Sequence, residues 1–178
     1  MSTSPSMFQE ISKINPTFKF ALREDLKDDK KFLPTRATPV STGWDVCCAQ
    51  QNRKQIILRP GQFIKIPLGF RTIAPEGWWL QLAPRSSTFA KKSLHCLYGV
   101  LDNDWFGNTV LAAQYIPDVN SLGKDLVLEF GEPIGQLIPF ELKTMEIEHI
   151  SNEQFEEIVK NKKSLRGIQG FGETRGLK

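Results

Sequence analysis

The chain has 178 residues, of which 40% are hydrophobic and 24% are charged, as in a soluble domain with its own core. Its net charge of +3 suits an anionic ligand but is too small by itself to predict nucleic-acid binding. The odd count of three cysteines, with Cys47 and Cys48 adjacent, argues against a disulfide framework and favours reduced thiols. With only two histidines and no CxxC pair, a zinc site is not expected.

The N-terminal stretch MSTSPSMFQEISKINP has neither a basic leader nor an apolar core, so it does not predict a signal peptide. No apolar run approaches the length that spans a bilayer. We therefore expect a cytoplasmic or otherwise intracellular protein without a membrane segment. The charge-dense run REDLKDDKKF, from residue 23, predicts either a short exposed helix or a loop, with solvated surface favoured.

The middle of the chain predicts short antiparallel strands. Its apolar runs are separated by three turn signals, Pro60-Gly61, Pro67-Leu68-Gly69 and Pro75-Glu76-Gly77. The segments 99–116 and 124–142 continue the pattern, with strands expected at 125–128 and 134–140 around the turn 131–133. Many short strands at regular spacing predict an all-β sandwich or a barrel-like fold.

Helix is scarce in the pattern. The best candidate is SNEQFEEIVKNKK, which Ser151 or Asn152 can cap and which ends in lysines. Its apolar stripe consists of Phe155, Ile158 and Val159. The last segment, RGIQGFGETRGLK, is a Gly-rich tail that we expect to be flexible unless a ligand or a partner orders it.

Two polar stretches beside predicted strands suit an anionic ligand. In STGWDVCCA, Asp45 lies between apolar residues, so its carboxylate needs a metal-bound water, an arginine or backbone donors. A structural salt bridge or a turn cap is the favoured interpretation of this stretch alone. In APRSSTFA, the planar fork of Arg85 and the hydroxyls of Ser86 and Ser87 suit phosphate oxygens. A serine-capped helix start with a surface arginine explains that stretch equally well.

Three further stretches carry possible site residues. In YGVLDNDWFG, Asp102 ends an apolar run and could act as a general base for water, and Trp105 could pack against a sugar or a base. A plain hairpin with a turn aspartate is the alternative. In GEPIGQLI, Gln136 needs a partner if buried, either a ligand phosphate or the backbone. In the tail, Arg166 could clamp a phosphate and Phe171 could stack on a planar base.

Taken in order, these stretches closely resemble the five motifs of the trimeric dUTP pyrophosphatase (dUTPase) family. The stretches are LPTRATPVSTGWDVCCA, APRSS, GVLDNDWFG, GEPIGQLI and RGIQGFGET, and the resemblance covers about residues 32–174. It implies an all-β fold, a dUTPase-like distorted jelly-roll barrel with one short helix and a flexible C-terminal arm. The implied division is an N-terminal extension, 1–31, a β domain, 32–165, and an arm, 166–178, that closes over an active site of a neighbouring subunit.

The resemblance also implies an activity, namely Mg²⁺-dependent hydrolysis of dUTP to dUMP and pyrophosphate by a homotrimer with active sites at subunit contacts. Asp102 would be the base that activates water for attack on the α-phosphorus, and Asp45 would act on Mg²⁺ through water. The main chain from Cys96 to Val100 would form a hairpin that reads the pyrimidine edge. The substrate-binding residues implied in this way are Arg85, Ser86, Ser87, Cys96, Gly99, Val100, Leu101, Trp105, Gln136, Arg166, Phe171 and Gly172. Neither nucleic acid nor a membrane is expected as a partner.

Departures from the family pattern keep alternatives open. Trp105 stands where the family usually has tyrosine, and Glu173 stands where it has a serine, which leaves open the same reaction on dCTP or a modified pyrimidine deoxynucleotide. Extra residues around 115–123 and 156–163 leave open a regulatory or binding trimer with the same fold. Deamination of dCTP is disfavoured because Ala112 stands where the related deaminase family would need a catalytic glutamate.

Overall fold

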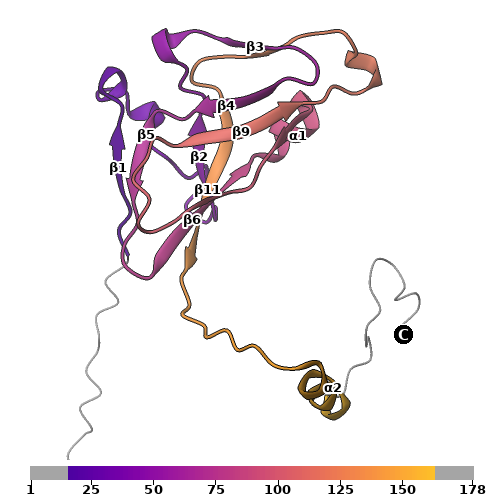
Figure 1. Cartoon of the computed structure of the whole chain (residues 1–178). Coiled ribbons are helices and arrows are strands. Elements are labelled where there is room, and N and C mark those ends of the chain that lie inside the picture. The colour runs from indigo at the N-terminus through magenta and orange to yellow at the C-terminus, as the bar shows by residue number, and fades with distance from the viewer. Residues whose placement is uncertain (1–15, 163–178) are drawn as a thin grey trace, which may run out of the picture. The chain divides into compact units, whose positions relative to one another are not determined.

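The computed structural model describes residues 16–162, and Figure 1 shows its elements. The chain forms two compact units, residues 1–143 and 144–178. The first unit holds eleven strands, β1 Lys19–Leu22, β2 Trp44–Cys47, β3 Ile56–Leu58, β4 Phe63–Pro67, β5 Phe70–Ile73, β6 Trp78–Pro84, β7 Leu94–Cys96, β8 Gly99–Leu101, β9 Val110–Tyr115, β10 Leu126–Leu128 and β11 Pro133–Glu141. It also holds the helix α1, Ser86–Lys92, and the short 3-10 helices η1 Glu24–Leu26, η2 Lys30–Phe32, η3 Gln51–Arg53 and η4 Val119–Ser121. The second unit contains α2, Asn152–Asn161.

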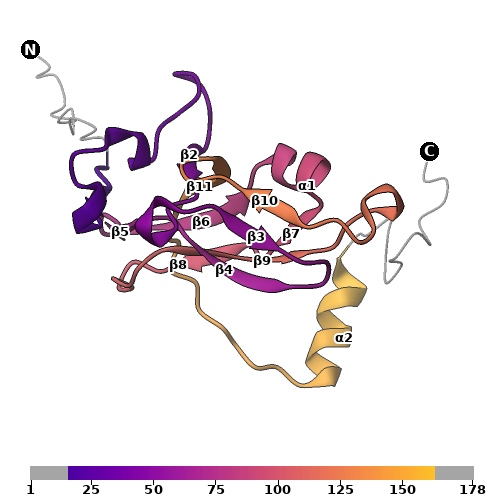
Figure 2. The same ribbon diagram turned by 90° about the horizontal axis from the view of Figure 1, so that it is seen from above.

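The strands of the first unit pair antiparallel in four sheets. The largest has the order β2-β11-β6-β8, the next has the order β4-β9-β7, and β1-β5 and β3-β10 are two-stranded. Figures 1 and 2 show these sheets gathered in one β body, with α1 beside β7. The predicted all-β class is confirmed, and the strands within the described ranges form separate sheets and no closed barrel.

The core follows from the period-two pattern of the strands. On β6, Leu80 and Leu82 are buried, whereas the neighbouring Trp79 and Gln81 are partly exposed on the opposite face. Buried Ile, Leu and Phe side chains from most of the sheets, among them Ile66, Phe70 and Leu111, form one cluster with those of β6. This one-sided burial is the main stabilising term, and it leaves one face of the four-stranded sheet outside the core.

The exposed face of that sheet has two different ends. At one end Trp79 of β6 and Phe140 of β11 lie directly opposite each other, with their rings stacked at 4.8 Å. Val100 of β8, which is 57% exposed, continues this apolar end. At the other end, Asp45 of β2 and Gln136 of β11 are opposite each other. The polar end carries two of the predicted site residues.

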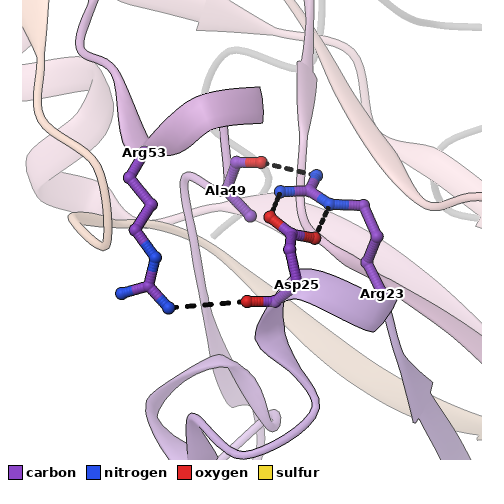
Figure 3. Close-up of polar contacts among 4 residues, drawn as sticks. All are labelled: Arg23, Asp25, Ala49 and Arg53. Atoms are coloured by element: carbon purple, nitrogen blue, oxygen red, sulfur yellow. Dashed lines mark hydrogen bonds and ion pairs between the residues drawn. The ribbon is translucent and has the colours of Figure 1, made fainter.

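The charge-dense run from residue 23 is mostly solvated surface, as expected, with most of its charged residues exposed. It forms the two 3-10 helices η1 and η2, and it buries Leu26 and Phe32 in a second small core. Arg23 holds this segment in place, as Figure 3 shows. Its guanidinium pairs with both carboxylate oxygens of Asp25, at 2.5 and 2.9 Å, and Nη1 donates to the carbonyl oxygen of Ala49 at 2.8 Å. The same hydrogen bonds lower the pKa of Asp25 below its ordinary value.

The N-terminal strand belongs to the same β body. β1 lies within the range predicted as an N-terminal extension, yet it pairs along its length with β5. Phe20 of β1 packs edge-on against Phe70 of β5, at 5.7 Å between ring centroids. The division into extension, domain and arm stays a prediction.

Between residues 16 and 162 there are two α-helices, where one short helix was expected. α2 is the predicted one, and it begins at a capping box in which the Ser151 hydroxyl accepts from the backbone N–H of Gln154 at 3.2 Å. The additional helix, α1, begins directly after β6 at Ser86. Its N-cap is Arg85, so the expected serine cap is wrong, but a helix does start in the arginine-serine stretch.

Glycines in the Pro/Gly turns allow a test of how much one glycine contributes to the stability of the fold. Gly69 has φ +76°, and a β-carbon there would lie 2.5 Å from Cδ1 of buried Leu26 and 2.7 Å from Cβ of buried Ala49. We expect Gly69→Ala to lower the free energy of unfolding by about 3 kcal/mol, because backbone strain and overpacking act together. Gly61→Ala is the matched control, since φ is +81° and nothing lies within 4 Å. Its expected loss is about 1 kcal/mol, and equal losses in urea unfolding at one protein concentration would contradict the packing argument.

Candidate active site

Asp45 and Arg85 meet although they come from different strands. Asp45 lies on β2, and Arg85 follows the end of β6, which is separated from β2 by β11 alone. Nε of Arg85 is 3.3 Å from Oδ1 of Asp45, and both side chains are partly exposed. The arginine partner and the salt bridge expected for Asp45 are therefore the same contact. A partly exposed pair of this kind contributes at most about 1 kcal/mol, so it can change partners when an anion binds.

Gln136 lies beside this pair on β11, directly opposite Asp45. Its Nε2 donates to the carbonyl oxygen of Pro84 at 3.2 Å, so the backbone partner considered for this amide is present. Gly43 makes room for the side chain, because a β-carbon at residue 43 would lie 2.5 Å from Oε1 of Gln136. The absence of a side chain at Gly43 thus sets the orientation of the Gln136 amide.

α1 is fixed to the sheet by two side chains. The buried hydroxyl of Thr88 donates to the carbonyl oxygen of Ile134 on β11 at 2.7 Å. Nζ of Lys92 is 2.5 Å from Oε1 of Glu132, in the turn before β11. These contacts hold the start of α1, with Ser86, at the edge of the polar end of the sheet.

A polar hollow of about 350 Å³ lies at this place, and we call it the Arg85 pocket. It brings together side chains from the first, second and fourth of the sequence stretches. Its lining consists of Ala37, Ser41, Thr42, Gly43, Asp45, Arg85, Ser86 and Gln136. Ser87 does not line it. The pocket offers a guanidinium, an amide and hydroxyl groups, which is the donor set that phosphate oxygens require.

The main chain from Cys96 to Val100, expected to form a hairpin, does not pair with itself. β7 pairs with β9 and β8 pairs with β6, so the two residues between them, Leu97 and Tyr98, cross from one sheet to another. The N–H of Leu97 donates to the carbonyl oxygen of Ala112 at 2.9 Å, whereas the side chains of Leu97 and Tyr98 are exposed. This crossing opens a gap between the two sheets that a paired hairpin would close.

The gap is a largely apolar hollow of about 230 Å³, which we call the Asp102 pocket. Its lining consists of Leu82, Leu97, Gly99, Val100, Leu101, Asp102, Trp105, Val110 and Ala112. Asp102 is exposed and follows β8, and its carbonyl oxygen accepts from the N–H of Trp105 at 3.2 Å, closing the expected turn. The pocket therefore combines apolar walls with one carboxylate and one indole.

Cys96 does not line the Asp102 pocket. It is the last residue of β7, and burial raises the pKa of its thiol to about 11. The group is therefore a neutral thiol at physiological pH, with no thiolate available for chemistry. Any contact of this position with a ligand would have to come from its main chain, which is the role that the sequence resemblance implies.

Asp102 and Arg85 are far apart within one chain. In the antiparallel register of β6 and β8, Leu80 is opposite Leu101, so Asp102 is level with Trp79. Arg85 lies six positions beyond Trp79 along the same extended strand, which corresponds to about 20 Å. A single chain thus holds two half-sites and does not bring Asp102 to Arg85.

Comparisons with known proteins identify the family of the chain. The sequence model of the dUTPase family matches residues 29–175. The chain belongs to the dUTPase family. It is therefore an enzyme, a hydrolase of nucleotide metabolism, as the sequence predicted.

Individual dUTPases are similar to the chain over most of their length. The deoxyuridine 5'-triphosphate nucleotidohydrolase of Arabidopsis thaliana is 28% identical over 172 residues, which cover 97% of this chain and 86% of the relative. The crystal structure of dUTPase from Streptococcus mutans aligns with TM-score 0.62 and 26% identity, covering 71% of this chain and 98% of that one. The dUTPase of Staphylococcus bacteriophage 80alpha with dUPNHPP has TM-score 0.70 at 20% identity and covers 89% and 98%, which shows a shared fold.

Some predicted dUTPase site residues fall outside the described range. Arg166, Phe171 and Gly172 lie beyond residue 162, so their roles stay predictions. Among residues 16–162, no helix is long and apolar enough to cross a membrane.

Two residues of the Arg85 pocket, Ser41 and Thr42, were not predicted from the sequence, although both stand in the first stretch, directly before Gly43.

Gly43 provides a test of the Arg85 pocket. In Gly43→Ala the new methyl group would displace the Gln136 amide and break its bond to Pro84, so we expect pyrophosphate release from dUTP to fall about tenfold or more. The control is a double-mutant cycle that combines Gly43→Ala with Gln136→Ala. If Gly43→Ala acts through the amide, adding it to Gln136→Ala changes turnover little. Independent, additive losses in the double variant would contradict this explanation.

Proposed function

We propose that the enzyme hydrolyses dUTP to dUMP and pyrophosphate in a homotrimer with active sites shared between subunits. The observation that carries this proposal is the pair of half-sites. One holds phosphate ligands around Arg85 and the other holds a carboxylate, Asp102, at the edge of an apolar pocket. A deoxynucleoside triphosphate has one part for each, a polyanionic chain and a flat apolar base with its sugar.

The separation of about 20 Å along β6 supports sharing between subunits. A general base must be within hydrogen-bond reach of the water that it activates, and that water must be next to the phosphate chain. An Asp102 and an Arg85 of one chain do not meet this condition, whereas those of two chains in a cyclic oligomer can. In this proposal the tail from Arg166 onward closes over the site, with Arg166 on phosphate and Phe171 and Gly172 over the nucleotide.

The proposed chemistry is an in-line displacement at the α-phosphorus. Asp102 takes a proton from water, the water oxygen bonds to the α-phosphorus, and the bond from that phosphorus to the bridging oxygen of pyrophosphate breaks. Charge grows on the phosphate oxygens and on the leaving pyrophosphate. Arg85, Ser86 and Gln136 would supply the donors from the Arg85 pocket, and Ser87, which does not line the pocket, would join them when the triphosphate binds. Stabilising this charge is usually the largest contribution that a site of this type makes.

The residues of the Arg85 pocket fit a hydrated Mg²⁺ ion in contact with the triphosphate. Among residues 16–162, no three His, Cys, Asp or Glu side chains gather as a metal-binding group, so protein ligands alone would not hold an ion. Mg²⁺ usually keeps several waters and uses few carboxylates together with phosphate oxygens. Asp45 is the carboxylate in this pocket and would contact the ion through water. When bound, the ion would neutralise charge on the phosphate oxygens.

The Asp102 pocket would bind the base and the deoxyribose. Gly99, Val100 and Leu101 contribute main chain along β8, and Trp105, which is 38% exposed, forms part of the opposite wall. The indole is larger than the tyrosine ring that the family usually has here. This substitution is the reason to keep dCTP or a modified pyrimidine deoxynucleotide as an alternative substrate. An intracellular location stays a prediction.

A panel of triphosphates tests the proposed activity. With Mg²⁺ present, we expect pyrophosphate release from dUTP to exceed that from dCTP, dTTP and UTP by at least about a hundredfold in kcat/KM. The different base edge of dCTP would leave polar groups unpaired, whereas the methyl group of dTTP and the 2′-hydroxyl of UTP would have to fit a pocket shaped for dUTP. Faster turnover of dCTP would select the alternative substrate. Release from none of the four would refute hydrolysis and leave the binding or regulatory trimer.

Mixed trimers test the shared site. Asp102→Asn removes the base but keeps the shape of the side chain, and Arg85→Ala removes the fork, so each variant alone should be nearly inactive. Co-expressed with different tags and purified through both, trimers containing both variants should regain about a third of wild-type turnover, since one site in three then joins two intact half-sites. A mixture no more active than its parents would place both residues in a site within one chain.

A further inference from the structure

Asn103, the residue after Asp102, is tied to a different part of the chain by its side chain. Its Nδ2 is 2.8 Å from the carbonyl oxygen of Pro75 and 3.2 Å from that of Trp78. The carbonyl oxygen of Ala74 follows at 3.4 Å. The β6–β8 register explains the contact, because Asn103 is level with Trp78 just beyond the last paired residue.

Only one orientation of the amide fits this position. All three neighbours are carbonyl oxygens, which accept and cannot donate, so Nδ2 with its two hydrogens must face them. The two hydrogens are shared among the three acceptors. A carboxylate or an apolar group of the same size offers no hydrogen there. The chemistry of this small site therefore selects asparagine over its isostere aspartate.

The partner of Asn103 is itself a fixed turn. The N–H of Trp78 donates to the carbonyl oxygen of Pro75 at 3.1 Å, which closes the turn 75–78 between β5 and β6. The carbonyl oxygen of Gly77 accepts from the N–H of Leu142 at 2.7 Å, directly after β11. The turn is thus anchored to the exit of β11 as well as to its own strands. It is a rigid support for whatever is attached to it.

Asp102 lacks such a support of its own. Its residue is exposed, and within the described residues its carboxylate accepts no hydrogen bond. Its position depends on the turn 102–105, whose backbone has one closing hydrogen bond, from Trp105 to Asp102 at 3.2 Å. Asp102 follows Leu101, which is buried and paired with Leu80, and the Asn103 amide adds a side-chain tie between this turn and the turn 75–78.

We infer that Asn103 is a positioning residue for the Asp102 base, acting through its three-carbonyl tether to the turn 75–78. The inference rests on the proposed function of Asp102. It assigns no contact between Asn103 and the substrate. Loss of the tether lets the turn 102–105 move, and a base displaced by about 1 Å loses about two orders of magnitude in rate. The phosphate ligands of the Arg85 pocket stay in place, so binding of the triphosphate chain is retained.

The test is Asn103→Asp, which keeps the size of the side chain and puts carboxylate oxygens against carbonyl oxygens. We expect kcat on dUTP to fall between about tenfold and a hundredfold. The Kd of the imido analogue dUPNHPP should change by less than about twofold, because the phosphate donors supply most of its affinity. Asn108→Asp is the matched control, with the same chemical change at an exposed position of the same loop, and its kcat should equal that of the wild type. Thermal unfolding and sedimentation of all three proteins monitor fold and assembly.

Each outcome decides the inference. A kcat that falls while the analogue Kd and the unfolding temperature stay constant supports positioning. Asn103→Asp with wild-type kcat overturns it, as does a parallel loss of kcat, analogue affinity and thermal stability, which identifies a purely structural role. If Asn103→Asp does not fold, Asn103→Ala removes the tether without adding charge and is judged by the same criteria. A wild-type protein that does not release pyrophosphate refutes the proposed function itself, whereas an active wild type with an equally active Asn103→Asp variant refutes only the role of Asn103.

Discussion

The register of the four-stranded sheet is the constraint on which the rest of the molecule depends. A shift of β6 by one residue against its neighbours would turn Leu80 and Leu82 out of the core and Trp79 and Gln81 into it, so burial fixes the alignment strongly. Once the alignment is fixed, Asp45, Gln136 and Ala83 form one row across three strands. The end of β8, with Asp102, then lies toward the opposite end of β6. Core packing thus fixes the strand register, and the strand register fixes the positions of the site residues.

Much of the site could be predicted from the sequence, because its residues stand in short stretches whose chemistry is local. The carboxylate of Asp45, the guanidinium of Arg85 and the amide of Gln136 each called for a partner, and these three side chains do gather in one pocket. The contact of Asp45 with Arg85 could not be predicted, since it joins positions 40 residues apart through the order of strands in a sheet. Pattern alone does not give strand order.

The fold class could also be predicted from the sequence. The local structures that were not predicted correctly have a common cause. The period-two pattern and the Pro/Gly turns indicated an all-β chain, and Gly61, Gly69 and Gly131 do have positive φ. The resemblance to the family implied a hairpin from Cys96 to Val100. Its strands pair with β9 and β6 instead, which bury Leu94 and Leu101 better than a bare hairpin could. Tertiary burial overrode this expectation, and the same applies to the 3-10 helices that bury Leu26 and Phe32.

The separation of the two half-sites has a consequence at the level of inheritance. In a trimer of the proposed kind, each chain lends its base to one neighbour and its phosphate ligands to another. A subunit damaged in the Arg85 pocket alone, or in the Asp102 turn alone, silences one site of the trimer, as it would if each site lay within one chain. A subunit damaged in both places silences two sites, each of which contains an intact half that belongs to a neighbouring chain. An allele of the second kind would reduce the output of the unaltered allele expressed beside it, and its effect would be partly dominant.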